Sequence, residues 1–411
     1  MNLLYMAHFF PCLWLIRGSP CKSNPTTSYD AKFGISLYRI LAEIEDGSNL
    51  IMSPASISLS LVLLQIGARG NTLAQLEGTT GSNINDVCFQ DVLSQTIDDL
   101  ENSSHSVWLQ VTNTLFIQSG FQLLPEFTKH VRLWCNSSLL NINFTSHPSY
   151  HNDLNQTHSG FQRQTPSKGE LIENKEEMEK AFWLPAMPPM TILSAVEFQG
   201  AWQKQFLFAE TKNLPFYLVD GSTVKVPMMY QSTEVKFGQF CLPSDQRYSV
   251  LELPYLGQSL SLLVVVPSER KTSLSQLEAQ LTSRTMAFWD TGLRHTKMDI
   301  FFPRFKMHSR FNLKPVLQSL GISDAFNPST ADFSGISDRE RLYVSAAMHE
   351  ASIEVKEEGT RAAAATAMVL LKRSRAPVFK ADRPFLFFLR HVNKGSLLFI
   401  GRVLDPVEQI H

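Results

Sequence analysis

EEGTRAAAATAMVLLKRS, residues 357–374, is the stretch on which the interpretation of this chain depends. It begins with charge and a glycine, continues with small side chains, and leads into a basic cluster made of Lys372, Arg373 and Arg375. Alanine has the highest intrinsic helix propensity, so the four consecutive alanines favour a helix. Two threonines, a valine and Gly359 favour extended chain, so propensity alone leaves both structures open. A third interpretation is an exposed loop that can later become a strand.

The order of side chains in this stretch is compatible with a strand inside a sheet, whose successive side chains point to opposite faces. Counted from Thr360, one face carries Thr360, Ala362, Ala364, Thr366, Met368 and Leu370. The other face carries Arg361, Ala363, Ala365, Ala367, Val369 and Leu371. The only charge falls on the second face, so the first can be buried, and small side chains lose little rotamer entropy. A surface helix or a linker rich in alanine remains the alternative.

Periodic patterns predict helices and strands along the rest of the chain. Apolar residues recur at helical spacing from Tyr29 to Leu41, and Ser53-Pro54 starts a second, nearly all-apolar helix that is ended by the stretch 67–72. The turn Asp220-Gly221 predicts a hairpin over residues 216–229. Further strands are predicted at 111–117, 191–202, 250–255, 260–266, 342–351, 381–390 and 398–403, with one ending at 303–306 and a short helix at 313–320.

Six or seven separate motifs, which follow one another along the chain in the family's order, resemble the serpin family. They are the hinge-like stretch from Glu357, the strand ending Phe198-x-Gly200-x-Trp202, the hairpin at 216–229, Asp324-Ala325-Phe326, Asp332-Phe333-Ser334-Gly335, the strand at 342–351 and the two C-terminal strands. The resemblance covers residues from about 30 to 406, except 144–185. It implies an α+β serpin fold, with a large central, mostly antiparallel sheet, further sheets, surrounding helices and an exposed reactive-centre loop at about 357–380. Residues 21–411 are expected to form one domain.

The resemblance also assigns roles within the loop. The loop hinge would consist of Glu357, Gly359, Thr360, Arg361, Ala362, Ala363, Ala364, Ala365 and Thr366. Family spacing from the hinge puts the reactive bond between Arg373 and Ser374, with Arg375–Ala376 as a second possible cleavage point. In non-inhibitory members, bulky, charged or proline residues tend to occur where insertion begins, whereas Gly359, Thr360 and the alanines favour insertion here.

A second set of residues corresponds to the region where the central sheet of serpins parts to admit the loop. These residues are Ser53, Ser56, Ser194, Trp202 and His349. The resemblance implies that His349 hydrogen-bonds near Ser53 and Ser56, which is a structural role. Local sequence gives the two serines a simpler role, because hydroxyl side chains before an apolar helix cap its first turn.

Three features depart from the family pattern. Residues 144–185 contain no match to the sequence of the helix that serpins usually have there, and 146–167 are rich in His, Asn, Gln and Ser. Ser194 stands where an asparagine is usual, Glu197 where a tyrosine is usual, and Arg361 where an acidic residue is common. A buried, unpaired carboxylate at Glu197 would be costly, so we expect it to face solvent or find a partner.

The N-terminus predicts secretion. Residues 1–20 contain an apolar core followed by small residues, which is typical of a signal peptide, and are too short and interrupted to span a bilayer. Four Asn-x-Ser/Thr triplets would accept glycans in a secreted chain: Asn102, Asn136, Asn143 and Asn155. No other membrane span is predicted.

Composition excludes several classes of function. The 411 residues are 44% hydrophobic and have a net charge of −1, which indicates a large core and no general attraction to nucleic acid. The five cysteines have no zinc-site spacing, and no cofactor or metal site is predicted. Residues 70–128 contain no Lys or Arg, which argues against heparin binding through the basic helix that serpins use there. No catalytic motif is present, so an enzyme is not expected.

The sequence therefore predicts a secreted, monomeric, suicide-type inhibitor of trypsin-like serine proteases that cleave after arginine. It resembles most the group of plasminogen-activator inhibitors and protease nexin. The alternative is a non-inhibitory serpin that acts as a carrier, a chaperone or a protease substrate. The hinge favours inhibition, while residues 144–185, Ser194 and Glu197 leave the alternative open.

Overall fold

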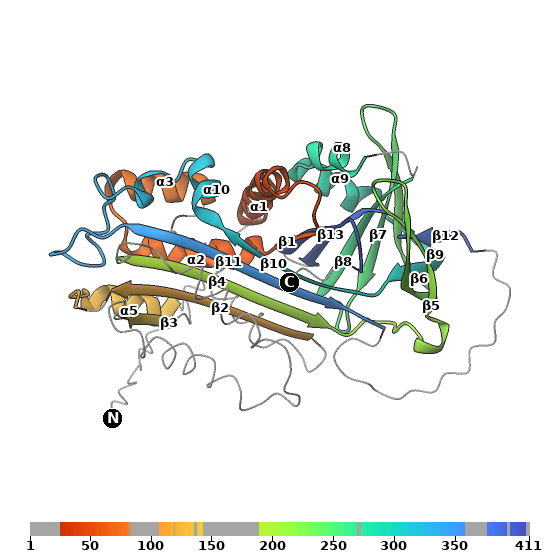
Figure 1. Cartoon of the computed structure of the whole chain (residues 1–411), viewed down its shortest axis with the longest axis horizontal. Coiled ribbons are helices and arrows are strands. Elements are labelled where there is room, and N and C mark those ends of the chain that lie inside the picture. Colours follow the sequence, from red (N-terminus) through yellow and green to blue (C-terminus); the bar gives the residue numbers. More distant parts are fainter. Residues whose placement is uncertain are drawn as a thin grey trace, which may run out of the picture.

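The computed structural model describes residues 25–81, 83, 107–118, 120–134, 138–142, 189–268, 273–357, 376–392 and 395–407. Within these residues the chain forms a five-stranded and a nine-stranded sheet with helices packed around them (Figure 1). The predicted α+β fold is confirmed. The described residues also share one contiguous hydrophobic core that includes both sheets.

The five-stranded sheet has the strand order β10-β11-β4-β2-β3. Its strands are β2 (Val107–Gln118), β3 (Ser138–Ile142), β4 (Met190–Gly200), β10 (Phe305–Asn312) and β11 (Val344–Val355). The sheet is mixed: β10–β11 and β2–β4 are antiparallel, whereas β11–β4 and β2–β3 are parallel. Buried and half-buried side chains alternate along most of β4 and β11, so one face of these two strands packs on the core.

The nine-stranded sheet is mostly antiparallel and has the order β1-β14-β13-β8-β7-β6-β9-β12, with β5 paired to β6. Its strands are β1 (Leu50–Met52), β5 (Lys212–Tyr217), β6 (Thr223–Cys241), β7 (Arg247–Pro254), β8 (Leu260–Pro267), β9 (Arg294–Pro303), β12 (Val378–Lys380), β13 (Phe385–His391) and β14 (Leu397–Val403). Only β9–β12 is parallel among these described pairs. The central strands β8 and β14 are buried on both faces, which explains their continuous apolar runs.

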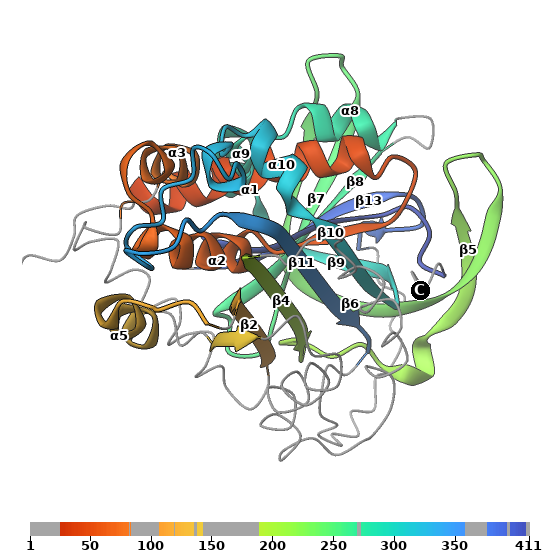
Figure 2. The same cartoon turned by 60° about the vertical axis from the view of Figure 1, so that its left-hand side comes forward.

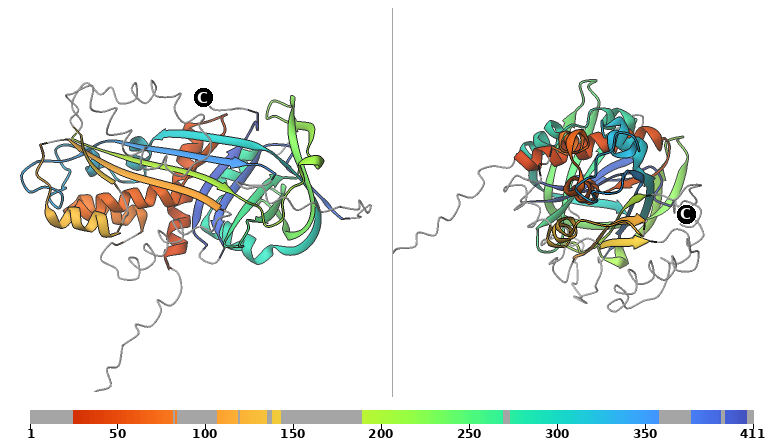
Figure 3. Two further views of the ribbon diagram at one scale, coloured as in Figure 1. Left: turned by 90° about the horizontal axis from the view of Figure 1, so that it is seen from below. Right: turned by 90° about the vertical axis from the view of Figure 1, so that its left-hand side faces the viewer.

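The helices are α1 (Pro25–Ile44), α2 (Pro54–Gly67), α3 (Gly70–Thr80), α5 (Pro125–Trp134), α8 (Leu274–Ala279), α9 (Ser283–Gly292) and α10 (Leu313–Ser319), with short 3-10 turns η1 (Phe208–Glu210) and η2 (Asp324–Phe326). Helices α1, α2 and α3 lie on one side of the five-stranded sheet, with α2 nearest to it (Figure 2). The views in Figure 3 show the strands of this sheet running along the length of the molecule toward the nine-stranded sheet.

Local chemistry sets both ends of α2, the helix that underlies the five-stranded sheet. Pro54 occupies its first turn and the Ser53 hydroxyl accepts a hydrogen bond from the Ser56 amide at 3.2 Å. At the other end, the Arg69 guanidinium donates to the carbonyl oxygens of Ile66 and Ala68 at 3.0 and 2.7 Å. A Cβ atom on Gly67 would lie 2.1 Å from the Ile336 side chain, so the close packing here requires glycine.

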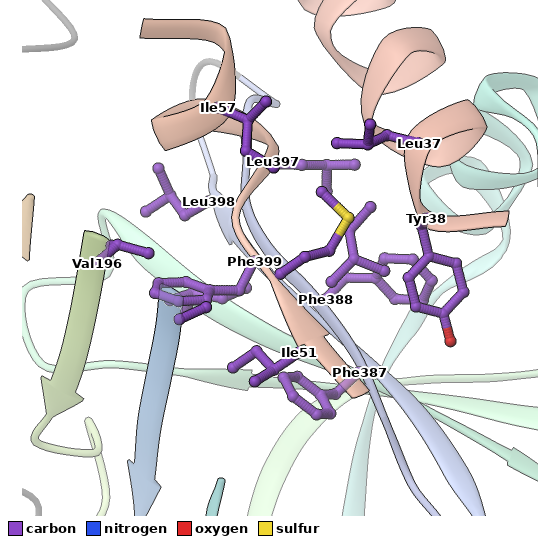
Figure 4. Packing of buried hydrophobic residues seen from close by; sticks show 14 of the residues in the cluster. Leu37, Tyr38, Ile51, Ile57, Val196, Phe387, Phe388, Leu397, Leu398 and Phe399 are labelled. Atoms are coloured by element: carbon purple, nitrogen blue, oxygen red, sulfur yellow. The ribbon is translucent and has the colours of Figure 1, made fainter. Parts of the chain in front are cut away.

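Where the two sheets meet, side chains from two helices and two strands form one core (Figure 4). Leu37 comes from α1, Ile57 from α2, Val196 from β4 and Phe399 from β14, and each is at most 5% exposed. Phe399 also contacts Phe198 of β4, with ring centroids 6.0 Å apart. The five-stranded sheet is therefore anchored to the nine-stranded sheet through β4.

The predicted elements are present with small changes at their ends. The second predicted helix has the expected bounds, and the hairpin turns at Gly221, whose φ of 85° is one that glycine adopts readily. The strand predicted at 191–202 ends at Gly200 instead. There a Cβ would lie 2.5 Å from the Tyr255 ring, and Trp202 forms an isolated bridge with Tyr255.

Candidate functional site

A row of polar side chains crosses the five-stranded sheet at one level. Asn113 of β2 lies opposite Ser194 of β4, and Ser194 lies opposite His349 of β11. The N-terminus of α2 brings Ser53 and Ser56 against this row. All five residues are at most 6% exposed. We call Ser53, Ser56, Asn113, Ser194 and His349 the polar cluster.

The polar cluster joins three strands and a helix by hydrogen bonds. The Ser53 amide donates to His349 Nε2 at 3.0 Å, and His349 Nδ1 lies 3.1 Å from the Ser194 carbonyl oxygen and 3.2 Å from its hydroxyl. The hydroxyls of Ser56 and Ser194 are 2.8 Å apart, and Ser56 donates to Asn113 Oδ1 at 3.4 Å. The hydrogen bond expected between His349 and the start of α2 is present. Because it uses the Ser53 amide, the Ser53 hydroxyl remains available to cap the helix.

The geometry requires a neutral imidazole at His349. Nε2 accepts from an amide, so the ring proton is on Nδ1 and is donated to the Ser194 carbonyl oxygen. Burial lowers the pKa of His349 from 6.5 to about 4, while the hydrogen bond to Ser194 and the charge of Glu350 act in the opposite direction. A protonated ring would direct an N–H at the Ser53 amide, which is itself a donor. The bond between β11 and α2 therefore depends on the neutral form.

Two residues that depart from the family pattern lie close to this row. Ser194 takes part in the polar cluster through its hydroxyl and its carbonyl oxygen. Glu197 lies three residues further along β4, so its side chain points to the opposite face of the sheet, where it is half-buried. Its carboxylate accepts a 3.4 Å hydrogen bond from the Gln199 side chain. Burial raises the pKa of Glu197. The partner expected for the Glu197 carboxylate is therefore the neutral side-chain amide of Gln199.

Trp202 lies away from the polar cluster, at the other end of the boundary between β4 and β11. Gly200 lies six residues beyond Ser194 on β4, a distance of about 20 Å. Trp202 Nε1 donates to the Lys356 carbonyl oxygen at 2.9 Å, and its ring stacks on Tyr255 with centroids 4.4 Å apart. The predicted sheet-opening residues thus occupy two places along the boundary between β4 and β11: Trp202 lies at one, and the other four lie in the polar cluster.

Glu357, the first predicted hinge residue, is held firmly where β11 ends. It is 3% exposed, and its carboxylate accepts a 2.8 Å hydrogen bond from the Thr211 hydroxyl and lies 3.6 Å from Arg304 Nη1. Its carbonyl oxygen accepts from the Phe206 amide at 3.1 Å. The chain therefore leaves the five-stranded sheet from a fixed point.

Ala376 is the next described residue after Glu357, and it leads into β12, an edge strand of the nine-stranded sheet among the described strands. Val378, Phe379 and Lys380 pair in parallel with β9, and the Lys380 ammonium lies 5.2 Å from the centre of the Phe301 ring. Residues 358–375 consequently connect the two sheets. The reactive bond Arg373–Ser374 and the hinge from Gly359 to Thr366 fall in this stretch and lie outside the described residues.

Other predicted features also lie outside the described residues. These are the signal peptide at 1–20, the atypical stretch at 144–185 and the sequons at Asn102, Asn136, Asn143 and Asn155. Cys241 is a free, exposed thiol. The other four cysteines lie outside the described residues. In the part of the chain that the structure describes, no three His, Cys, Asp or Glu side chains are placed to hold a metal ion. None of its helices is long and apolar enough to cross a membrane.

Sequence reasoning missed three residues of this site: Asn113, Thr211 and Arg304. Asn113 falls within the strand predicted at 111–117, but no local signal links it to Ser194, because the register between β2 and β4 is a long-range property. Thr211 lies between η1 and β5, Arg304 lies between β9 and β10, and both meet Glu357 only in the folded chain. No spacing pattern in the sequence identifies these contacts.

Comparison with known proteins identifies the class to which this fold and site belong. A model of the family described as "Serpin (serine protease inhibitor)" matches residues 28–406. The chain therefore belongs to the serpin family. It is 57% identical to "Probable serpin E3" of Danio rerio over 99% of this chain and 100% of that protein.

Two further comparisons agree with the predicted resemblance to protease nexin. "Glia-derived nexin" of Mus musculus is 32% identical over 91% of both chains. A crystal structure of native protease nexin-1 with heparin superposes with a TM-score of 0.80 at 28% identity, covering 93% of this chain and 99% of that one. Serpins are in general protease inhibitors and not enzymes, although some members of the family are non-inhibitory.

Proposed function

We propose that this chain is a secreted inhibitor of trypsin-like serine proteases that acts by inserting its own loop into the five-stranded sheet. The protease attacks the carbonyl of Arg373, forms an acyl-enzyme and releases Ser374 as the new N-terminus. Residues 359–371 then enter between β4 and β11 and carry the tethered protease away before hydrolysis. Arg373 suits such proteases because its guanidinium pairs with a carboxylate in the specificity pocket.

The pairing of β4 with β11 is the observation that carries this proposal. The two strands are parallel neighbours from Met190 to Gln199 and from Val344 to Glu354, and β11 leads directly into the hinge. A chain that reverses direction after Glu357 would run antiparallel to both strands. Insertion would therefore replace one parallel pairing by two antiparallel pairings, which are slightly more stable per residue.

The energetic drive is large enough to perform mechanical work on a bound protease. Each inserted residue gains backbone hydrogen bonds worth about 0.5–1.5 kcal/mol net, so a dozen residues provide on the order of 10 kcal/mol. The small side chains of residues 362–365 keep the entropic cost of ordering low. The polar cluster opposes opening until cleavage frees the loop.

Heparin binding is a separate question, because the related protease nexin-1 was solved with heparin. We propose that this chain does not bind heparin through the corresponding basic helix, since residues 70–128 contain no Lys or Arg. Polyanions bind proteins mainly through clustered cationic side chains. Retention on a heparin column at physiological salt would contradict this proposal.

The test is to incubate the secreted protein with trypsin, thrombin and a plasminogen activator, and to separate the products on denaturing gels. We expect a complex that survives denaturation and contains the protein cleaved after Arg373, as determined by mass spectrometry. The variant Arg373→Ala should lose the complex with all three proteases, while Arg375→Ala should retain it. This matched pair distinguishes the proposed bond from Arg375–Ala376.

Three outcomes would change the assignment. Cleavage after Arg373 without a stable complex would make the protein a protease substrate and favour the non-inhibitory alternative. A stable complex that persists in Arg373→Ala but disappears in Arg375→Ala would move the reactive bond by two residues. If none of the three proteases cuts the loop, the specificity for arginine is wrong.

A further inference from the structure

A row of side chains crosses β6, β9 and β12, which lie side by side at one edge of the nine-stranded sheet (Figure 1). Phe301 of β9 lies opposite Tyr230 of β6 on one side and opposite Lys380 of β12 on the other. The rings of Tyr230 and Phe301 have centroids 5.0 Å apart, and the Lys380 ammonium lies 5.2 Å from the centre of the Phe301 ring. The row is therefore an aromatic pair that ends in a cation.

Val378 adds an exposed apolar side chain beside this row. It lies two residues before Lys380 on β12, and Phe379 between them is buried, so Val378 and Lys380 both point away from the core. Val378 is 54% exposed, which places it among the large hydrophobic side chains that the described part of the molecule leaves open to solvent. We call Tyr230, Phe301, Val378 and Lys380 the β12 patch.

The β12 patch carries a cation that the described part of the chain does not neutralise. Lys380 is exposed, and no carboxylate of the described residues forms an ion pair with it. Asp299 lies opposite Val378, and its carboxylate accepts a 3.3 Å hydrogen bond from the Tyr230 hydroxyl. Aromatic side chains are enriched in protein interfaces, and a charge at the rim of an interface mainly raises the rate of association.

The position of the β12 patch in the chain brings it within reach of a protease at the proposed reactive bond. Val378 lies five residues beyond Arg373, so the two are at most about 18 Å apart. A protein interface of standard size buries about 800 Å² on each partner, which corresponds to a disc about 16 Å in radius. A protease centred on Arg373 therefore covers or borders Val378.

We propose that the β12 patch is a second contact surface for the target protease, beside the reactive bond. Its partner is a face of the protease, next to the catalytic cleft, that presents an apolar side chain to Val378 and a carboxylate to Lys380. This inference rests on the proposed inhibition and adds to it a surface that selects among proteases which all cleave after arginine.

The β12 patch acts only before loop insertion. Val378 and Lys380 follow the cleaved bond in the chain and are paired with β9, so they remain with the nine-stranded sheet. The protease stays bonded to Arg373 and leaves with residues 359–371. The patch therefore raises the rate of the first encounter and contributes nothing to the final complex.

The experiment measures the second-order rate constant with which the full-length protein inhibits trypsin, thrombin and a plasminogen activator. We expect Val378→Glu and Lys380→Glu each to lower this constant by about threefold to thirtyfold for at least one of the three proteases. The fraction of protein that ends in the stable complex should be unchanged. The same loss should appear in the Kd for the affected protease with its catalytic serine replaced by alanine, because that complex stops before insertion.

Two exposed positions elsewhere supply matched controls. Val407→Glu is the control for Val378→Glu, since Val407 is 53% exposed and follows β14, near the opposite edge of the nine-stranded sheet. Lys32→Glu is the control for Lys380→Glu, since Lys32 is exposed on α1. Both controls should inhibit at the wild-type rate. High salt should reduce the loss in Lys380→Glu, because it screens the charge.

The outcomes separate this inference from the proposed inhibition. If either test variant stays within about threefold of the wild-type rate for all three proteases, the inference is overturned and the proposed inhibition stands. A dimer of the wild-type protein that Val378→Glu dissociates would also overturn it, because the β12 patch would then bind a second copy of this chain. If the wild type forms no stable complex with any of the three proteases, the proposed inhibition has failed, and this inference fails with it.

Discussion

At the scale of single residues, His349 couples the stability of the closed sheet to pH. Its neutral ring accepts from the Ser53 amide and donates to the Ser194 carbonyl oxygen, and burial lowers its pKa to about 4. In the unfolded chain the pKa is about 6.5, so between these values the unfolded chain binds a proton that the folded chain does not. Stability is therefore lost as the pH falls from about 6.5 to about 4.

We expect the melting temperature of the wild-type protein to fall across this pH window by more than that of His349→Gln. A full shift of this size corresponds to about 3 kcal/mol. The measurement is thermal unfolding followed by circular dichroism at pH 7.5, 6.0 and 4.5. His295→Gln is the control, because His295 is exposed on β9. Equal pH dependence in the wild type and His349→Gln would show that this buried ring does not govern acid stability.

At the scale of elements, the alternation of the hinge predicts which face of the inserted strand is buried. Ala364 lies on the face of the stretch that carries no charge, and Ala365 lies on the face that carries Arg361. We expect Ala364→Arg to turn the inhibitor into a substrate, because an unpaired charge on the buried face costs several kcal/mol. Ala365→Arg should still form stable complexes, because its side chain would join the outward face.

The measurement is the ratio of cleaved protein to protease complex at a fixed protease concentration. Ala364→Arg should raise this ratio at least about tenfold, as a loss of a few kcal/mol of insertion energy predicts. The reverse order of the two variants would show that the faces are exchanged. Equal ratios would mean that the segment does not enter the sheet as a strand.

The sequence predicts elements better than it predicts their partners. The bounds of α2 follow from Ser53, Pro54 and Gly67, and the β5–β6 hairpin follows from Asp220-Gly221, because these signals act within a few residues. The row from Asn113 through Ser194 to His349 depends on the register of three strands that are far apart in the chain. Family resemblance assigned Ser53, Ser56 and His349 to this region but grouped them with Trp202, which lies at the other end of the boundary between β4 and β11.

At the scale of the whole molecule, the uncleaved protein is predicted not to be the most stable form of the chain. Cleavage of the loop removes the connection between the two sheets and permits insertion, with a gain on the order of 10 kcal/mol. For a chain of this length we expect the melting temperature to rise by on the order of 10 °C after cleavage at Arg373. Scanning calorimetry before and after limited trypsin treatment measures this change. A melting temperature that is unchanged or lower after cleavage would contradict insertion.

The position of the last strands has a consequence for any cut between the sheets. Beyond residue 375 the chain supplies the edge strand β12 and also β13 and β14, which lie between β8 and β1 in the nine-stranded sheet. Phe385, Phe387, Phe388 and Phe399 are fully buried there. A protease that severs the loop therefore produces a heterodimer of two peptides, held together without any covalent bond. The smaller peptide, residues 374–411, should be released only when the larger one is unfolded.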